Sequence, residues 1–198
     1  MTVFGLSLDR RIGPVAGMMG LSWYNESGTV LGARLNDGFG SKGADTAFLD
    51  AQAVWPFARG WQISGAIRRG WTFARSSGSI AAGSRLASMA WSLDLERQGA
   101  FTAHDRVGLR LSQPLRVESG GLRLNLPIAY DYVTQSATYG IRTLNMAPQG
   151  RELMGELAWS GPLGPGSATA SLFYRHEPGH YADMPADTGV AVNWRMRF

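Results

Sequence analysis

Two histidines and a glutamate near the C-terminus have the spacing of a zinc peptidase. The stretch His176-Glu177-Pro178-Gly179-His180 matches HExxH, a pattern that binds zinc when a helix places both imidazoles on one face. Pro178 and Gly179 fall inside the turn that this helix needs, and proline removes a donor and clashes within a helix. The preceding residues alternate as a strand does, so we expect the motif at a strand exit, without a metal.

The sequence does not contain a recognisable set of residues for nucleophilic catalysis. A subtilisin-type site needs a serine in a Gly-Thr-Ser context with a positioned histidine and aspartate, and no Gly-Thr-Ser occurs. His104 and Asp105 are expected in a solvated turn, without a serine partner. Residues 38–43 match GxGxxG, but a strand at residues 47–55 follows where a dinucleotide site needs a helix. We expect neither enzymatic activity nor a cofactor.

Composition narrows the class of protein. The 198 residues are 44% hydrophobic, and no window approaches the ~18 uninterrupted apolar residues of a membrane-spanning helix. The chain has no cysteine, which removes disulfides and thiolate chemistry. Its net charge of +4 comes mostly from single, scattered arginines, whereas nucleic-acid sites cluster their charge. The 26 glycines and 7 tryptophans suit tight turns and membrane–water interfaces.

The C-terminal stretch shows the pattern that recurs along the chain. Alternate side chains of a strand point to opposite faces, so residues 187–198 present one apolar and one cationic face. The apolar row resembles a signal read by the outer-membrane assembly machinery and consists of Val190, Val192, Trp194, Met196 and Phe198. An apolar-out, polar-in strand with aromatic ends is typical of outer-membrane barrels. The last strand of a soluble sandwich would also alternate.

Alternating segments separated by glycine, proline and serine predict an all-β fold, an antiparallel up-and-down outer-membrane β-barrel. We expect about eleven strands, at residues 3–9, 15–25, 47–55, 61–73, 87–96, 107–112, 122–132, 138–146, 153–159, 168–174 and 190–198, with a short strand inside 29–35. A bulge near Gly70 and a turn at 118–121 complete this scheme. Bacterial barrels have even strand numbers, so a twelfth strand is expected upstream and residues 1–198 form one N-terminally truncated domain.

The expected barrel has two distinct ends and two distinct faces. The turn at 161–166 is expected on the periplasmic side, and the long loops 27–43 and 176–187 outside. The side chains expected to face lipid are Leu122, Leu124, Leu126, Ile128 and Leu157. The side chains expected to line the lumen are Arg68, Arg110, Arg123, Asp131, Glu156, Arg175, Arg195 and Arg197. Mixed charges indicate a hydrated interior that admits a polypeptide or, alternatively, simple structural pairing.

Several short motifs occur in a fixed order: Gly70-Trp71-Thr72, Gln113-Pro114-Leu115-Arg116-Val117, Leu126-Pro127 with Tyr130-Asp131-Tyr132, Gly150-Arg151-Glu152 and Arg175-His176-Glu177-Pro178-Gly179. With the terminal Phe198, they make the chain from about Leu21 onward resemble the C-terminal autotransporter-like β-domain of subtilisin-family serine peptidases from Gram-negative bacteria.

The resemblance implies a function and a location. In that family the N-terminal part is the peptidase, and the C-terminal barrel anchors it in the outer membrane and helps it reach the cell surface. The implied partners are outer-membrane lipid, the assembly machinery and the chain's own upstream passenger, with no nucleic acid. A small outer-membrane porin or ligand-binding barrel is the alternative, and a soluble sandwich is the third possibility.

Overall fold

The computed structural model describes residues 2–34, 36, 39–40 and 42–196. These residues form an all-β fold, as the alternating pattern predicts. The strands are β1 Thr2–Ile12, β2 Val15–Glu26, β3 Thr29–Val30, β4 Ala33–Arg34, β5 Ala44–Ala58, β6 Trp61–Ala74, β7 Arg85–Gln98, β8 Arg106–Asp131, β9 Ser136–Asn145, β10 Leu153–Leu163, β11 Gly166–His176 and β12 Asp187–Met196. In the part of the chain that the structure describes, no helix has the length and apolarity needed to cross a bilayer.

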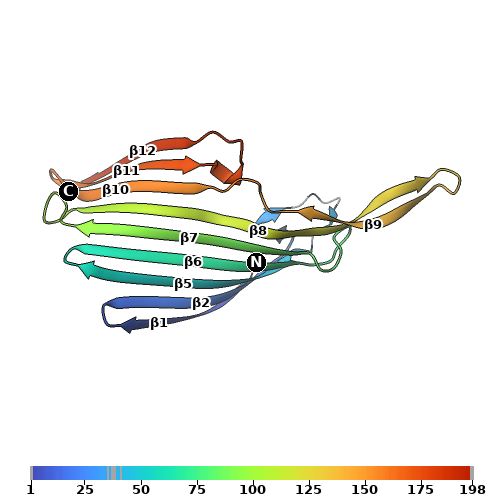
Figure 1. The fold of residues 1–198 in the computed structure, drawn as a ribbon, viewed down its shortest axis with the longest axis horizontal. Coiled ribbons are helices and arrows are strands. Elements are labelled where there is room, and N and C mark those ends of the chain that lie inside the picture. The colour runs from blue at the N-terminus through green and yellow to red at the C-terminus, as the bar shows by residue number, and fades with distance from the viewer. Residues whose placement is uncertain (1, 35, 37–38, 41, 197–198) are drawn as a thin grey trace.

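Most of the strands form one antiparallel sheet. Its order is β1-β2-β5-β6-β7-β8-β10-β11-β12, and β9 pairs with the C-terminal part of β8, beyond the part that pairs with β10 (Figure 1). Neighbours in the sheet are therefore neighbours in sequence, except that β3 and β4 lie between β2 and β5, and β9 lies between β8 and β10. Strands β3 and β4 pair with each other in a second, two-stranded sheet. The prediction of an all-β, antiparallel fold is confirmed.

The sheet has two edges, β1 and β12. Among the described residues, no backbone pairing joins these two strands. The closed barrel expected from the sequence therefore stays a prediction, and the observed form is an open sheet of nine strands along the path from β1 to β12.

The connections at the two ends of the sheet differ in length. Residues 13–14, 59–60, 99–105 and 164–165 link strands at one end, which we call the turn end. Residues 27–43, 75–84 and 177–186 link strands at the other, which we call the loop end, and the β8–β9 hairpin projects there (Figure 1). The predicted separation of the turn at 161–166 from the loops 27–43 and 176–187 is confirmed, and which end faces the cell exterior stays a prediction.

The prediction of a turn at residues 118–121 is wrong, because β8 continues as a strand through these residues. The β7–β8 ladder continues from Gln98 opposite Arg106 to Arg85 opposite Gly121, with two register shifts. A Cβ on Gly120 would collide with the carbonyl of Arg85, and one on Gly121 with the carbonyl of Leu144. These glycines therefore serve close strand approach inside a bulged ladder, not a reversal of the chain.

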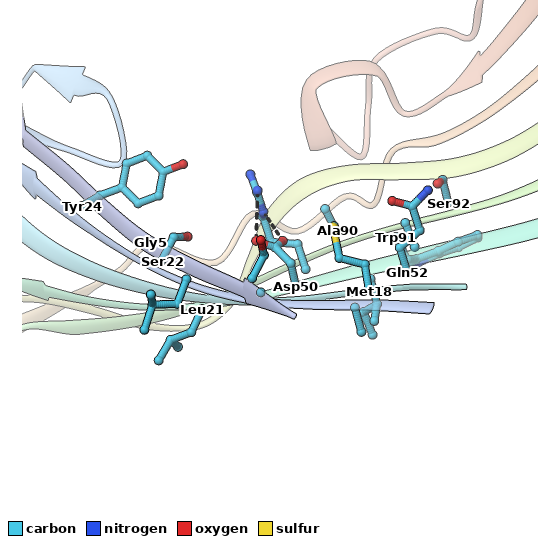
Figure 2. A pocket seen from close by; sticks show the side chains of 17 residues that line it. Gly5, Met18, Leu21, Ser22, Tyr24, Asp50, Gln52, Ala90, Trp91 and Ser92 are labelled. Carbon is cyan, nitrogen blue, oxygen red and sulfur yellow. Dashed lines mark hydrogen bonds and ion pairs between the residues drawn. The ribbon is translucent and has the colours of Figure 1, made fainter. Parts of the chain in front are cut away.

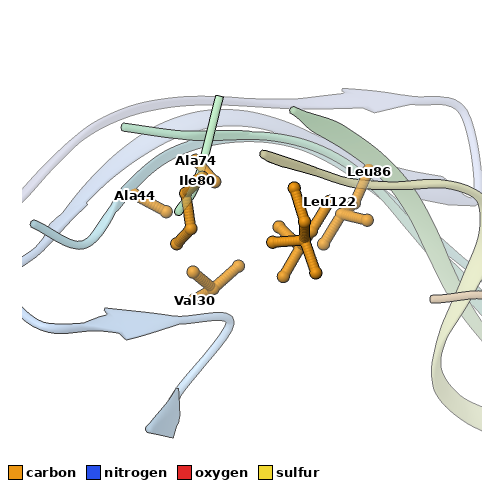
Figure 3. Close-up of a cluster of buried hydrophobic side chains, with 7 residues drawn as sticks. Val30, Ala44, Ala74, Ile80, Leu86 and Leu122 are labelled. Atoms are coloured by element: carbon orange, nitrogen blue, oxygen red, sulfur yellow. The ribbon is translucent and has the colours of Figure 1, made fainter. Parts of the chain in front are cut away.

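Beyond these bulges, β8 turns its leucines to the side opposite to the one predicted. Leu122 and Leu124 are only 2% and 5% exposed, so the prediction that they face lipid is wrong. They belong to a buried cluster beneath the β3–β4 hairpin and the 75–84 loop (Figure 3), made of Val30, Ala44, Ala74, Ile80, Leu86, Leu122 and Leu124. Leu126 packs against this cluster. An irregular ladder shifts face assignment by one residue, which alternation alone does not reveal.

The predicted bulge near Gly70 is also wrong. The β5–β6 ladder runs without a shift from Ala44–Ala74 to Trp55–Ile63, and Arg69 keeps its place in register between Leu49 and Met89. Gly70 makes room for an aromatic ring, because a Cβ there would lie 2.6 Å from Cε1 of Phe48.

Candidate functional site

One face of the sheet is uncovered and mostly apolar, although Arg69 lies in it between Leu49 and Met89. Register places Leu6, Leu21 and Leu49 in one row, and Leu109, Leu157, Leu172 and Val190 in another. The exposed aliphatic side chains of this apolar face are Leu6, Leu8, Met19, Leu21, Leu49, Ile67, Leu93, Leu109, Leu111, Leu157, Leu172, Val190 and Val192. Water-soluble monomers rarely expose contiguous apolar patches above a few hundred Å². The apolar face therefore has the character of a contact surface for lipid or protein.

Aromatic side chains gather toward both ends of the apolar face. Those near the loop end are Phe4, Trp23, Trp71 and Phe73, and those near the turn end are Trp55, Phe57, Trp61, Trp159 and Trp194. Trp61 and Trp71 are ten residues apart on β6, which is roughly 33 Å along a strand. A strand tilted by 35–45° would reduce this to about 25 Å, the height of the apolar band of a membrane barrel.

Two indole nitrogens at the turn end have hydrogen-bond partners. Trp159 Nε1 donates to Asp105 Oδ2 at 3.1 Å, and Trp194 Nε1 donates to the Leu163 carbonyl at 3.2 Å. Burial raises the pKa of Asp105, but hydrogen bonds from Trp159 and from backbone amides outweigh it and hold the pKa below its ordinary value. Amphipathic rings with a polar tip in this arrangement suit a membrane–water interface.

The opposite, polar face carries ion pairs between adjacent strands. Arg68 Nε lies 2.6 Å from Asp50 Oδ1, and Arg110 Nε lies 2.6 Å from Asp94 Oδ1. The Asp50–Arg68 pair sits in a hollow of about 630 Å³ formed by β1, β2, β5, β6 and β7 (Figure 2). The Arg68 guanidinium also lies 5.1 Å above the ring of Phe48. These pairs neutralise the charges of Arg68 and Arg110 locally.

Five of the residues predicted to line a lumen share the polar face. Register places Asp94, Arg110 and Glu156 in one row. The five are Arg68, Arg110, Glu156, Arg175 and Arg195. These five residues lie on the same side of the sheet, as the sequence predicts, and their role in lining a lumen stays a prediction.

The other three residues of that set lie elsewhere. Arg123 alternates with Leu122 and Leu124, so it lies on the other side of β8, and its Nη1 donates to the Ala82 carbonyl at 2.7 Å. Asp131 lies at the tip of the β8–β9 hairpin, where a hydrogen bond from the Val133 amide at 2.8 Å holds the pKa of the carboxyl below its ordinary value. Arg197 lies outside the described residues.

The predicted assembly signal occupies an open edge. Val190, Val192, Trp194 and Met196 point to the apolar side of β12 and are all exposed, and Phe198 lies outside the described residues. Their role in recognition by assembly machinery stays a prediction.

The HExxH stretch forms part of a link between two loops. It follows strand β11, as predicted, and Pro178–His180 forms a 3₁₀ turn. His180 Nδ1 accepts a hydrogen bond from the Glu152 amide at 2.9 Å, and its Nε2 donates to the Leu115 carbonyl at 3.2 Å. One neutral tautomer satisfies both bonds. Within the described ranges, no three His, Asp or Glu side chains group as metal ligands.

Glu152 is the centre of this loop link, which the sequence does not predict. The residue is 3% exposed. Its Oε1 lies 2.7 Å from Arg175 Nε, and its Oε2 accepts a hydrogen bond from the Gly179 amide at 2.7 Å. Arg175 also reaches Asp187 at 3.3 Å. The carboxylate therefore joins residues 146–152 to the 177–186 loop and to the start of β12.

A second group of charged side chains bridges a gap in the sheet. The β8–β10 ladder ends at Ser112, and the β8–β9 ladder begins at Gly121. Arg116 fills the interval by donating to the carbonyls of Gly150 at 2.9 Å and Pro148 at 2.6 Å. The motifs that contain these residues were visible in the sequence, but only the strand interruption explains why they meet.

We predict that the loop link depends on pH. The hydrogen bond from Arg175 holds the pKa of Glu152 below its ordinary value of 4.5. A lowered carboxyl pKa stabilises the fold above the ordinary value, and this contribution is lost as the pH falls through the lowered one. Protection of residues 177–186 from hydrogen exchange, relative to their intrinsic exchange rates at each pH, should therefore be lost in wild type as the pH falls through this lowered pKa. In Glu152→Gln this protection should already be low at pH 7.

Glu156→Gln is the matched control for this measurement, because Glu156 is the next carboxylate along the chain and lies on β10, outside the link. It should leave exchange in residues 177–186 unchanged. Equal exchange in wild type and Glu152→Gln at pH 7 would show that the ion pair does not hold the loop.

Comparison with known proteins adds no assignment: no family model, curated protein or solved structure matches this chain. The functional conclusion therefore depends on the contrast between the apolar and polar faces of the sheet and on the contrast between its turn end and loop end.

Proposed function

We propose that the chain is a β-barrel domain of the bacterial outer membrane that anchors an N-terminal passenger and helps it to the cell surface. The observation that carries this proposal is the exposed apolar face, which extends across all nine strands from β1 to β12 with ion pairs behind it. Lipid is the environment that favours such a face, since strands in a bilayer alternate apolar-out and polar-in.

The ends of the sheet support the same proposal. The spacing between the aromatic groups corresponds to a bilayer core, and the short and long connections segregate as periplasmic turns and external loops do. Strand β1 starts at the loop end. Polypeptide attached ahead of β1 would therefore emerge on the side of the long loops, which is the cell exterior in this orientation. The resemblance to autotransporter-like domains adds a subtilisin-like serine peptidase as the expected passenger.

A small porin is the second candidate, and the buried cluster weighs against it. Val30 and Ile80 bring the β3–β4 hairpin and the 75–84 loop against the inner side of the sheet at the loop end (Figure 3). A solute path along the polar face would have to pass this apolar obstruction. An anchor needs no permanently open path.

A reporter fusion tests the proposal. A signal peptide and a small protein domain with a protease site are placed ahead of Thr2, and an epitope tag follows Phe198. In intact Gram-negative cells, added protease should release the reporter and leave the tag intact, because the two lie on opposite sides of the membrane. Recovery of both in the soluble periplasm would contradict membrane anchoring. Steady single-channel conductance with a retained reporter would favour the porin.

A further inference from the structure

The two open edges of the sheet run in the same direction. Each antiparallel neighbour reverses direction, and nine strands lie on the path from β1 to β12. An odd number makes the first and the last strand parallel, so both β1 and β12 run from the loop end to the turn end. This relation follows from connectivity alone and does not depend on the curvature of the sheet.

The direction of the edges limits what can cover them. Direct pairing of β1 with β12 would be parallel, and pairing of β1 with β12 of a second copy would be parallel too. Two β12 edges could pair antiparallel only if the copies were inverted in the membrane. A strand running from the turn end to the loop end is antiparallel to both edges at once. The requirement that such a strand covers the edges rests on the proposed function, because in lipid the amides and carbonyls of an open edge have no water to bind.

We propose that the edges of β1 and β12 form one binding site for a single amphipathic β-strand. This strand belongs to a polypeptide segment outside the described residues and runs from the turn end to the loop end. The neighbouring strands are 11 and 10 residues long, and the bound strand matches them. Its outward positions are apolar, because Leu6, Leu8, Val190 and Val192 flank it on the apolar face.

Charge sets the inward positions of this strand. Arg11 and Arg195 both lie on the polar face near the turn end of their strands. Among the described residues, neither has a carboxylate partner within ion-pair distance, in contrast to Arg68 and Arg110. Asp9 precedes Arg11 by two residues on the same face. The bound strand therefore has an acidic residue first, opposite Arg11, and a basic residue two positions later, opposite Asp9.

Disulfide trapping of synthetic peptides tests this site, since the chain has no cysteine of its own. The full chain carries Ile12→Cys on β1 or Val192→Cys on β12, both on the apolar face toward the turn end, and is refolded in detergent. Two alternating peptides have the acid-then-base pattern and one cysteine, at the N-terminus or at the C-terminus. The N-terminal cysteine should cross-link to both variants, and the C-terminal cysteine to neither. A peptide with the two charges exchanged should cross-link roughly two- to fivefold less.

Controls separate this site from other arrangements. Ala170→Cys on β11, which has a partner strand on each side and lies on the same apolar face, should not cross-link. An intramolecular disulfide in the Ile12→Cys/Val192→Cys double variant without peptide would show parallel self-closure, and an intermolecular one would show pairing between copies. Either result overturns the proposal. So does a cross-link to the peptide with the C-terminal cysteine, and so does the absence of a cross-link to either peptide when the chain has refolded. Failure of the chain to enter detergent or lipid at all would instead contradict the proposed function.

Discussion

Arginine in place of Leu157 should lower the free energy of unfolding of the lipid-embedded chain by ~2–4 kcal/mol. Leu157 is 49% exposed at the middle of β10, in the row that contains Leu109 and Leu172. If this face contacts lipid, a guanidinium there loses its hydration without gaining a partner. Equilibrium unfolding in urea from lipid vesicles measures the change.

The adjacent position supplies the matched control. Ala158 lies on the polar face, in register with Gly108 and Ser171, and Glu96 lies opposite Gly108 in the same row. Arginine at Ala158 can therefore meet a carboxylate and water, and the free energy of unfolding should change little. Equal losses at both positions would rule out the assignment of the two faces.

Alanine in place of Leu122 should lower the free energy of unfolding by ~2–5 kcal/mol, since truncation of a fully buried leucine loses transfer energy and leaves a cavity. The cluster around Leu122 also holds Val30 and Ile80, so the 75–84 loop should become more accessible to protease. Urea unfolding with limited proteolysis measures both effects.

Leu172→Ala is the control for cavity formation, because Leu172 is 54% exposed on the apolar face. Its truncation removes contacts with lipid but opens no internal cavity, so we expect a smaller loss and no change in proteolysis of the 75–84 loop. A loss at Leu172 as large as at Leu122 would contradict the inward placement of the cluster.

The two leucines also show how far alternation predicts this fold. Period-two patterning located most of the strands, because each strand has different surroundings on its two sides, but it divided β8 at residues 118–121. It placed Leu157 correctly on an exposed side and Leu122 wrongly, since the bulges in the β7–β8 ladder change the relation between sequence parity and face. A bulge is a property of two paired strands, and one strand's sequence does not contain it.

The candidate site was predictable to a similar extent. The paired charges on adjacent strands, such as Asp50 and Arg68, follow from strand parity and register. The buried link at Glu152 does not, because it joins loops distant in sequence through His180 and Arg175. Side chains that meet across irregular segments obey no period. Only the path of the backbone brings them together.

The sequential order of the strands has a consequence for the kinetics of folding. Because nearly every strand of the main sheet pairs with the strand of that sheet that precedes it, the sheet can grow from any hairpin, and each addition closes only one connecting segment. Loop-closure entropy rises slowly with length, so residues 27–43 cost roughly 2 kcal/mol more to close than a two-residue turn. The β8–β10 ladder spans the longest interval, because the C-terminal part of β8 and the whole of β9 lie between its paired residues. We expect this ladder to form late and to set the folding rate.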